Sequence, residues 1–227
     1  MRPPIEFLFP PEIGAELIYS FVIILCSLMV YYATREMYEL SSYKGIKYFR
    51  QSFLFFAIAY FSRYFIQFFL VLFKVQDILE FSPMYIGWIT LFVFLFSSAM
   101  AVFYLLYSVM WKKWNHSKLK IIMFNIFAFL IAFIGASIRG IIVSLLLNII
   151  LLAFVLFILS VAYKDSKDKK KGKNLFIIYI LLSIFWILNV IDILIPKFLQ
   201  IYQLVIYLAS ILLFMIILYK VLKKAGK

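Results

Sequence analysis

The sequence predicts an all-α integral membrane protein: one domain, residues 1–227, built as a seven-transmembrane-helix bundle with the N-terminus outside and the C-terminus cytoplasmic. Three observations predict this fold. The chain is 67% hydrophobic, whereas a soluble domain is roughly half apolar. Its apolar residues fall in blocks of about 18 or more, the length of a membrane-spanning helix. Its basic residues gather in every second loop, as the positive-inside rule describes.

Charged and turn residues delimit the seven predicted helices. At about 1.5 Å rise per residue, each helix can cross a hydrocarbon core of ~30 Å. Proline at a helix start is tolerated, and the prolines that bound these runs all lie at or outside a helix end. In chain order the predicted helices are 12–34, 48–73, 83–111, 119–137, 140–163, 174–195 and 198–221. Their limits are marked by Pro10-Pro11, Lys47, Lys74, Pro83, Lys118, the Gly135–Gly140 link, Lys164, Lys173 and Pro196.

The distribution of Lys and Arg predicts the orientation. Of the 23 basic residues, 18 lie in alternate loops and in the C-terminal tail, and four lie in the opposite loops. The positive-inside rule places the richer set in the cytoplasm. The loops therefore account for the net charge of +13, and we expect them to face membrane lipids or a cytoplasmic or membrane partner. Because they are short, we expect no nucleic-acid binding.

Several classes of chemistry have no residues to support them. The chain has one cysteine, Cys26, and one histidine, His116, in different regions. Cysteine-based metal clusters, zinc sites, paired-histidine haem and Cys–His catalysis all need more of these residues. We therefore expect no metal, no cofactor and no enzyme activity in this protein of the cell membrane.

Arg63 is the unusual residue, because it lies within one of the most apolar stretches. A charge inside a membrane is rare, faces the bundle interior and indicates a functional site by default. Counted from Arg50, Arg63 lies roughly 20 Å above the cytoplasmic edge. Glu16 and Asp192 lie at roughly 28 Å by the same count. Since arginine can extend outward, we predict that Arg63 pairs with Glu16, Asp192 or both.

Other polar residues recur at helical spacing beside these three charges. Tyr60 and Gln67 share a face with Arg63, Asn189 precedes Asp192 by three residues, and Gln203 and Tyr207 are four apart. If these faces converge, they enclose a polar, aromatic-lined pocket suited to a small polar or amphiphilic ligand. The predicted ligand-binding residues are Glu16, Tyr60, Arg63, Gln67, Asn189, Asp192, Gln203 and Tyr207.

These residues favour a receptor-like or sensory protein, with two alternatives: a small transporter or channel, and a structural or assembly protein whose ion pair only joins helices. The last predicted helix has no lysine before Lys220, which excludes a covalent retinal protein. In size and topology the chain resembles the seven-helix input modules of prokaryotic sensor proteins, which implies that a signal would pass to a separate partner.

Overall fold

The computed structural model describes residues 11–65, 83–111, 114, 118–138, 140–168, 173–195 and 200–225, and all regular structure in these ranges is helical. Seven α-helices lie where the sequence predicts seven spans. They are α1 Pro11–Ser41, α2 Lys44–Tyr60, α5 Pro83–Met110, α6 Lys118–Ser137, α7 Ile141–Asp168, α8 Lys173–Leu194 and α9 Gln200–Ala225, and α2 continues into a π-helical turn, η2 Phe61–Phe65.

Two helices extend furthest beyond their predicted ends. The first helix was expected to end at residue 34 and the fifth at 163, but α1 continues to Ser41 and α7 to Asp168. Loss of apolar character marks where a helix leaves lipid, whereas the helix itself continues until its hydrogen bonding is interrupted. In α1 the extension carries an i,i+4 ion pair, and the break comes at Ser42, whose φ of 49° is left-handed.

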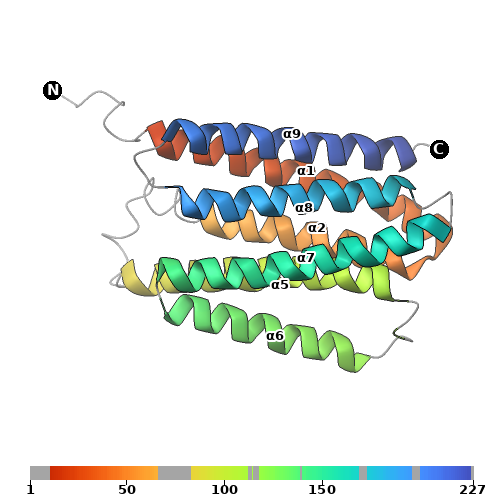
Figure 1. Ribbon diagram of the computed structural model, residues 1–227, viewed down its shortest axis with the longest axis horizontal. Helices are drawn as coiled ribbons and strands as arrows, with labels where there is room; N and C mark the ends of the chain where they lie inside the picture. The colour runs from red at the N-terminus through yellow and green to blue at the C-terminus, as the bar shows by residue number, and fades with distance from the viewer. Residues whose placement is uncertain are drawn as a thin grey trace.

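The helices run side by side, and successive helices alternate in direction (Figure 1). Along α1, α2, α5, α7, α8 and α9 each helix packs on the next, and α9 returns to α1, so these six form a closed ring. α6 packs against α5 outside that ring, with a smaller contact to α7. The alternation brings the starts of α1, α5, α7 and α9 to the same end as the ends of α2, α6 and α8.

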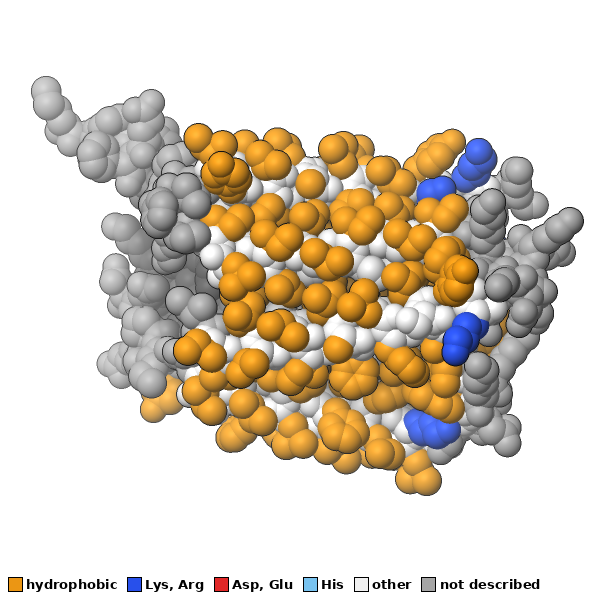
Figure 2. Space-filling model, in the orientation of Figure 1, with side chains coloured by type: hydrophobic (Ala, Val, Ile, Leu, Met, Phe, Trp, Pro, Cys, Tyr) orange, Lys and Arg blue, Asp and Glu red, His pale blue; other side chains and the backbone are white. Residues whose placement is uncertain are grey.

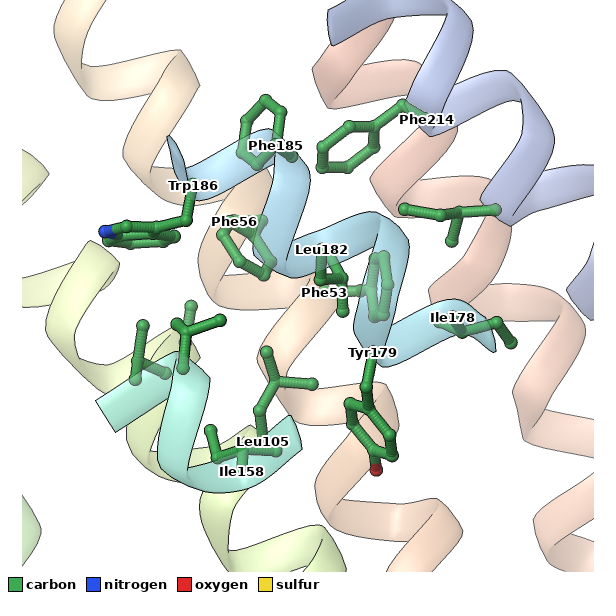
Figure 3. Close-up of a cluster of buried hydrophobic side chains, with 14 of the residues drawn as sticks. Phe53, Phe56, Leu105, Ile158, Ile178, Tyr179, Leu182, Phe185, Trp186 and Phe214 are labelled. Atoms are coloured by element: carbon green, nitrogen blue, oxygen red, sulfur yellow. The ribbon is translucent and has the colours of Figure 1, made fainter. Parts of the chain in front are cut away.

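Aromatic side chains fill the interior of the ring (Figure 3). Phe185 of α8 and Phe214 of α9 meet edge to face with ring centroids 4.7 Å apart. Phe53 and Phe56 of α2 pack on Phe214 at 6.4 and 6.2 Å. Offset and edge-to-face pairs of this kind add packing energy beyond the area they bury. These rings therefore form a packed aromatic core where α2, α8 and α9 meet.

The face shown in Figure 2 is apolar over its middle zone and carries basic side chains at one end. Within the described ranges, six helices, all except α2, contain stretches long and apolar enough to cross a membrane. On α1 the outward stripe consists of large apolar side chains that are 41–65% exposed: Ile18, Phe21, Leu25, Met29 and Tyr32. Exposed apolar surface on this scale fits lipid and not water. The chain is thus a multi-pass membrane protein.

The remaining predicted span, 48–73, is described only as far as Phe65. Near its start α2 lies very close to α5, because Gly45 has no side chain there. A Cβ at Gly45 would lie 2.5 Å from Tyr43 Cε1, 2.9 Å from Trp111 Nε1 and 3.0 Å from the Ser108 backbone oxygen. Small residues at helix crossings permit this close packing in membranes. Ser108 and Tyr179 then join α5 to α8 through a buried hydroxyl pair at 2.9 Å.

Candidate functional site

A change of helix type accompanies Arg63. After Tyr60 the α-helical turns of α2 give way to the π-helical turn η2, which packs against α1 and α5. Phe61 N–H lies against both the Ala57 and Ile58 carbonyls, and the Ser62 hydroxyl donates to the Ala59 carbonyl at 2.8 Å. Short π-helical turns are rare and are frequently found at functional sites.

The Arg63 guanidinium has an aromatic partner that hydropathy does not predict. Its Cζ lies 5.0 Å from the centroid of the Phe94 ring on α5. A cation over a ring face is attracted by the ring quadrupole, and this attraction is strongest where water is excluded. Arg63 also interacts electrostatically with Tyr60 and Asp192. A direct ion pair of Arg63 with Glu16 or Asp192 stays a prediction.

Three helices are joined by a chain of buried polar groups next to η2. The Tyr60 hydroxyl of α2 donates to Asn189 Oδ1 of α8 at 3.1 Å and lies 3.0 Å from the Tyr19 hydroxyl of α1. Because a phenol has one hydrogen, Tyr19 is then the donor to Tyr60. The Asn189 amide donates in turn to the Phe185 carbonyl at 2.9 Å. Tyr19 and Tyr60 are only 4% and 5% exposed, so these bonds form away from water.

A fourth helix, α9, joins through Tyr207. Its ring stacks on Tyr19 with centroids 4.7 Å apart, and its hydroxyl donates to Glu16 Oε1 at 3.3 Å. Glu16 therefore belongs to the same assembly as the tyrosines. We call this assembly the polar cluster; its members are Glu16, Tyr19, Tyr60, Arg63, Asn189, Asp192 and Tyr207.

Asp192 is the least satisfied member of the polar cluster. It lies one turn beyond Asn189 on α8, and it interacts electrostatically with both Arg63 and Glu16. Its Oδ1 atom is buried and accepts no hydrogen bond within the structure. A buried carboxylate oxygen without a donor is costly, and such atoms call for an explanation. Two acids and one arginine therefore meet at the end of the bundle opposite the basic end.

The predicted site residues are largely brought together. Glu16, Tyr60, Asn189 and Tyr207 are joined by hydrogen bonds, and Arg63 and Asp192 lie within electrostatic range of them. Gln203, half-buried one turn before Tyr207, makes no hydrogen bond to the cluster among the described side chains. Gln67 lies outside the described residues.

Tyr19 is the member that the sequence analysis missed. It lies three residues after Glu16, on the same face of α1, so helical spacing could have indicated it. Within the described ranges no three His, Cys, Asp or Glu residues are arranged to hold a metal ion. An apolar crevice at the other end of α5, lined by Met100, Phe103, Tyr104, Tyr107, Ile121 and Phe124, has no room for a water molecule.

A relative in Archaeoglobus fulgidus shares this chain's whole length. The two sequences are 30% identical over 232 residues, an alignment that covers 98% of this chain and 95% of the relative. This chain and the archaeal protein belong to one family. The family's protein in Archaeoglobus is described only as an uncharacterized protein. No family model matches the chain, and no solved structure matches it.

Proposed function

We propose that this protein is a seven-helix membrane receptor or sensor that binds a small polar or amphiphilic ligand at the polar cluster. The observation that carries the proposal is the convergence of polar side chains from α1, α2, α8 and α9 beside a π-helical turn. Polar and charged groups inside a membrane are expensive and are usually functional. We assign the cluster a binding role and no reaction.

The chemistry of the cluster supports a ligand with hydrogen-bond donors and an apolar part. Asp192 Oδ1 has no donor within the structure, so a ligand hydroxyl or amine would satisfy it. The stacked rings of Tyr19 and Tyr207 supply flat apolar surface beside the carboxylate of Glu16. Apolar walls with a few well-placed polar groups are typical of small-molecule sites.

The proposal includes seven spans, with the basic end in the cytoplasm and the cluster toward the outside. Described basic residues at the ends of α1, α7 and α9 and at the starts of α2, α6 and α8 all lie at one end of the bundle. The positive-inside rule assigns that end to the cytoplasm. A ligand would then arrive from outside, and a signal would pass to a separate partner at the basic loops.

A transporter is the second candidate, and the π-helical turn favours it. Transporter sites are commonly built where a membrane helix departs from regular α-helical geometry. The sequence contains no proline in the interior of a predicted helix, but η2 supplies such a departure at the turn that carries Arg63. Solute uptake into liposomes containing the purified protein, lost in Arg63→Ala, would decide for transport.

The binding proposal is tested by ligand-dependent thermal stability. The purified protein in detergent is screened against lipids, amino acids, sugars and apolar chromophores, with Asp192→Asn and Ser108→Ala beside it. Asp192→Asn keeps the shape of the site and removes its charge. Ser108→Ala removes a buried hydroxyl pair with Tyr179, away from the cluster, and is the matched control.

We expect one ligand class to raise the melting temperature of the wild type and of Ser108→Ala, and to leave Asp192→Asn unchanged. An equal rise in Asp192→Asn would place the ligand elsewhere. If no ligand class stabilises the wild type while Asp192→Asn and Arg63→Ala only lower the melting temperature, the cluster is structural and the binding proposal is wrong.

A further inference from the structure

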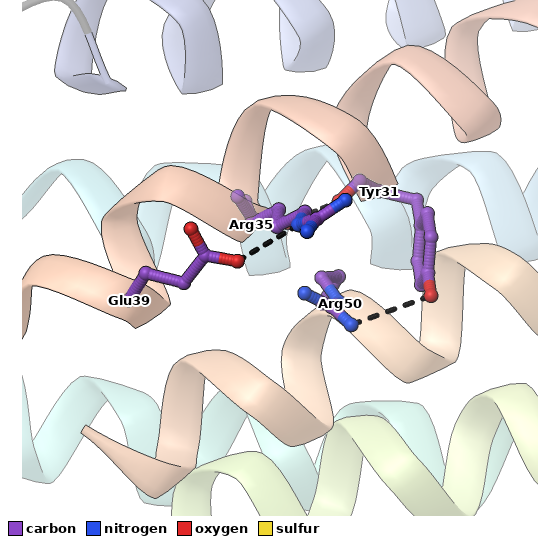
Figure 4. A network of polar contacts seen from close by, with 5 residues as sticks. Tyr31, Arg35, Glu39 and Arg50 are labelled. Carbon is purple, nitrogen blue, oxygen red and sulfur yellow. Dashed lines mark hydrogen bonds and ion pairs between the residues drawn. The ribbon is translucent and has the colours of Figure 1, made fainter. Parts of the chain in front are cut away.

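A half-buried arginine, Arg50, lies at the opposite, basic end of the bundle. Arg50 is in the second turn of α2, and its Cζ lies 4.6 Å from the centroid of the Tyr31 ring on α1. Its Nη2 donates to the Tyr31 hydroxyl at 3.3 Å (Figure 4). Its Nε is buried and has no hydrogen-bond partner. Among the described residues no carboxylate forms an ion pair with Arg50.

The surroundings of Arg50 carry excess positive charge. Lys47 is exposed and lies three residues earlier on α2, on the same face. Arg35 lies four residues after Tyr31 on α1, and its Nε bonds Glu39 Oε1 at 2.8 Å. Between residues 35 and 50, four cations stand against two carboxylates. An additional anion would therefore be attracted to this position.

The neighbours of Arg50 indicate that this anion is a lipid. Tyr31 packs edge to face on Tyr32 with ring centroids 5.4 Å apart. Tyr32 is 63% exposed and is the last residue of the outward stripe that also contains Leu25 and Met29. Tyrosines occupy the headgroup level of membranes, with apolar surface for acyl chains beyond them. A headgroup bound near Arg50 would thus have its acyl chains beside this stripe.

We propose that Arg50, oriented by Tyr31 and assisted by Arg35 and Lys47, binds the phosphate of an anionic phospholipid in the leaflet at the basic end. Guanidinium binds phosphate through parallel, charge-assisted hydrogen bonds, which a lysine-rich surface alone does not provide. General attraction to an anionic leaflet would depend on the sum of the charges. Binding at a specific site would instead depend on Arg50 in particular.

The test uses the full-length protein in detergent with equal amounts of phosphatidylglycerol and phosphatidylcholine, and counts bound lipids by native mass spectrometry. Arg50→Gln is compared with Lys224→Gln, which removes one exposed charge from the end of α9 at the same end of the bundle. We expect the first phosphatidylglycerol to bind about tenfold more weakly to Arg50→Gln, as the loss of a charge-assisted bond implies. Lys224→Gln should change binding by less than about twofold, as a single screened surface charge does.

Tyr31→Phe keeps the ring and removes the hydroxyl that orients Arg50, and it replaces Arg50→Gln in the test if that variant does not fold. We expect Tyr31→Phe to bind the first phosphatidylglycerol about threefold more weakly, because one hydrogen bond is lost. Equal binding by the Arg50 and Lys224 variants would overturn the proposal. Inorganic phosphate is run as a separate arm. If phosphate displaces bound phosphatidylglycerol at equal concentration, the site takes a soluble anion and the lipid assignment is wrong.

Discussion

Tyr60→Phe tests the hydrogen-bonded chain that defines the polar cluster. The substitution keeps the ring and removes a hydroxyl with two bonds, 3.0 Å to Tyr19 and 3.1 Å to Asn189, at a residue that is 5% exposed. Side-chain hydrogen bonds contribute about 0.6 kcal/mol on average inside membranes and about 1 kcal/mol in proteins generally. Loss of both, with Asn189 Oδ1 left without its donor, gives about 1–3 kcal/mol of destabilisation.

The assay is equilibrium unfolding in mixed micelles. Tyr202→Phe is the matched control: it lies at the same end of the bundle on α9, is 60% exposed, and should change the unfolding free energy by less than about 0.5 kcal/mol. A double-mutant cycle of Tyr19→Phe with Tyr60→Phe should give a coupling of about 0.6–1.7 kcal/mol. If Tyr60→Phe unfolds at the same free energy as Tyr202→Phe, the reasoning is refuted.

Three further substitutions test two packed positions and one surface ion pair, each by the same unfolding measurement. Gly45→Ala should cost about 1–3 kcal/mol, since its Cβ would crowd the Tyr43 ring, Trp111 and the Ser108 carbonyl. Gly14→Ala, where a Cβ would meet no atom within 4 Å, should be neutral or slightly stabilising. Equal effects of the two substitutions would contradict the close packing at Gly45. Phe53 is fully buried, so Phe53→Ala should cost about 3 kcal/mol through the cavity that it leaves. Leu212 is 60% exposed, so Leu212→Ala should cost much less. A small effect at Phe53 would mean that the core is loosely packed. Glu39→Gln should change stability by less than about 0.5 kcal/mol, because its ion pair with Arg35 is 58–62% exposed; a larger loss would show that this pair holds the α1 extension.

Hydropathy and helical spacing predicted most of the architecture. The seven α-helices lie where apolar runs indicated spans, because an apolar run of this length is stable in lipid only as a helix. The seven-span count and the orientation stay predictions. Spacing also predicted that Tyr60, Asn189, Glu16 and Tyr207 face the same interior, since polar side chains avoid lipid and so set the rotation of each helix.

The details that spacing did not predict depend on contacts between distant residues. The π-helical turn at Arg63 packs against α1 and α5, which are distant from it in sequence, and no local pattern in Phe61–Phe65 indicates it. The position of Arg63 over Phe94 likewise depends on which side of α5 faces η2. Tyr19 was overlooked because tyrosines are so common in this chain, 16 in all, that its position after Glu16 did not stand out.

The most direct test of the account is to locate the two ends of the bundle relative to the membrane. In a Cys26→Ser background, single cysteines are introduced as Ser137→Cys, at the exposed end of α6 on the side of the polar cluster, and as Lys224→Cys, at the basic end of α9. A membrane-impermeant maleimide is then applied to intact cells. The account predicts labelling of the Ser137 variant in intact cells and of the Lys224 variant only after lysis. Labelling of the Lys224 variant from outside would put the polar cluster in the cytoplasm and contradict an outward-facing site.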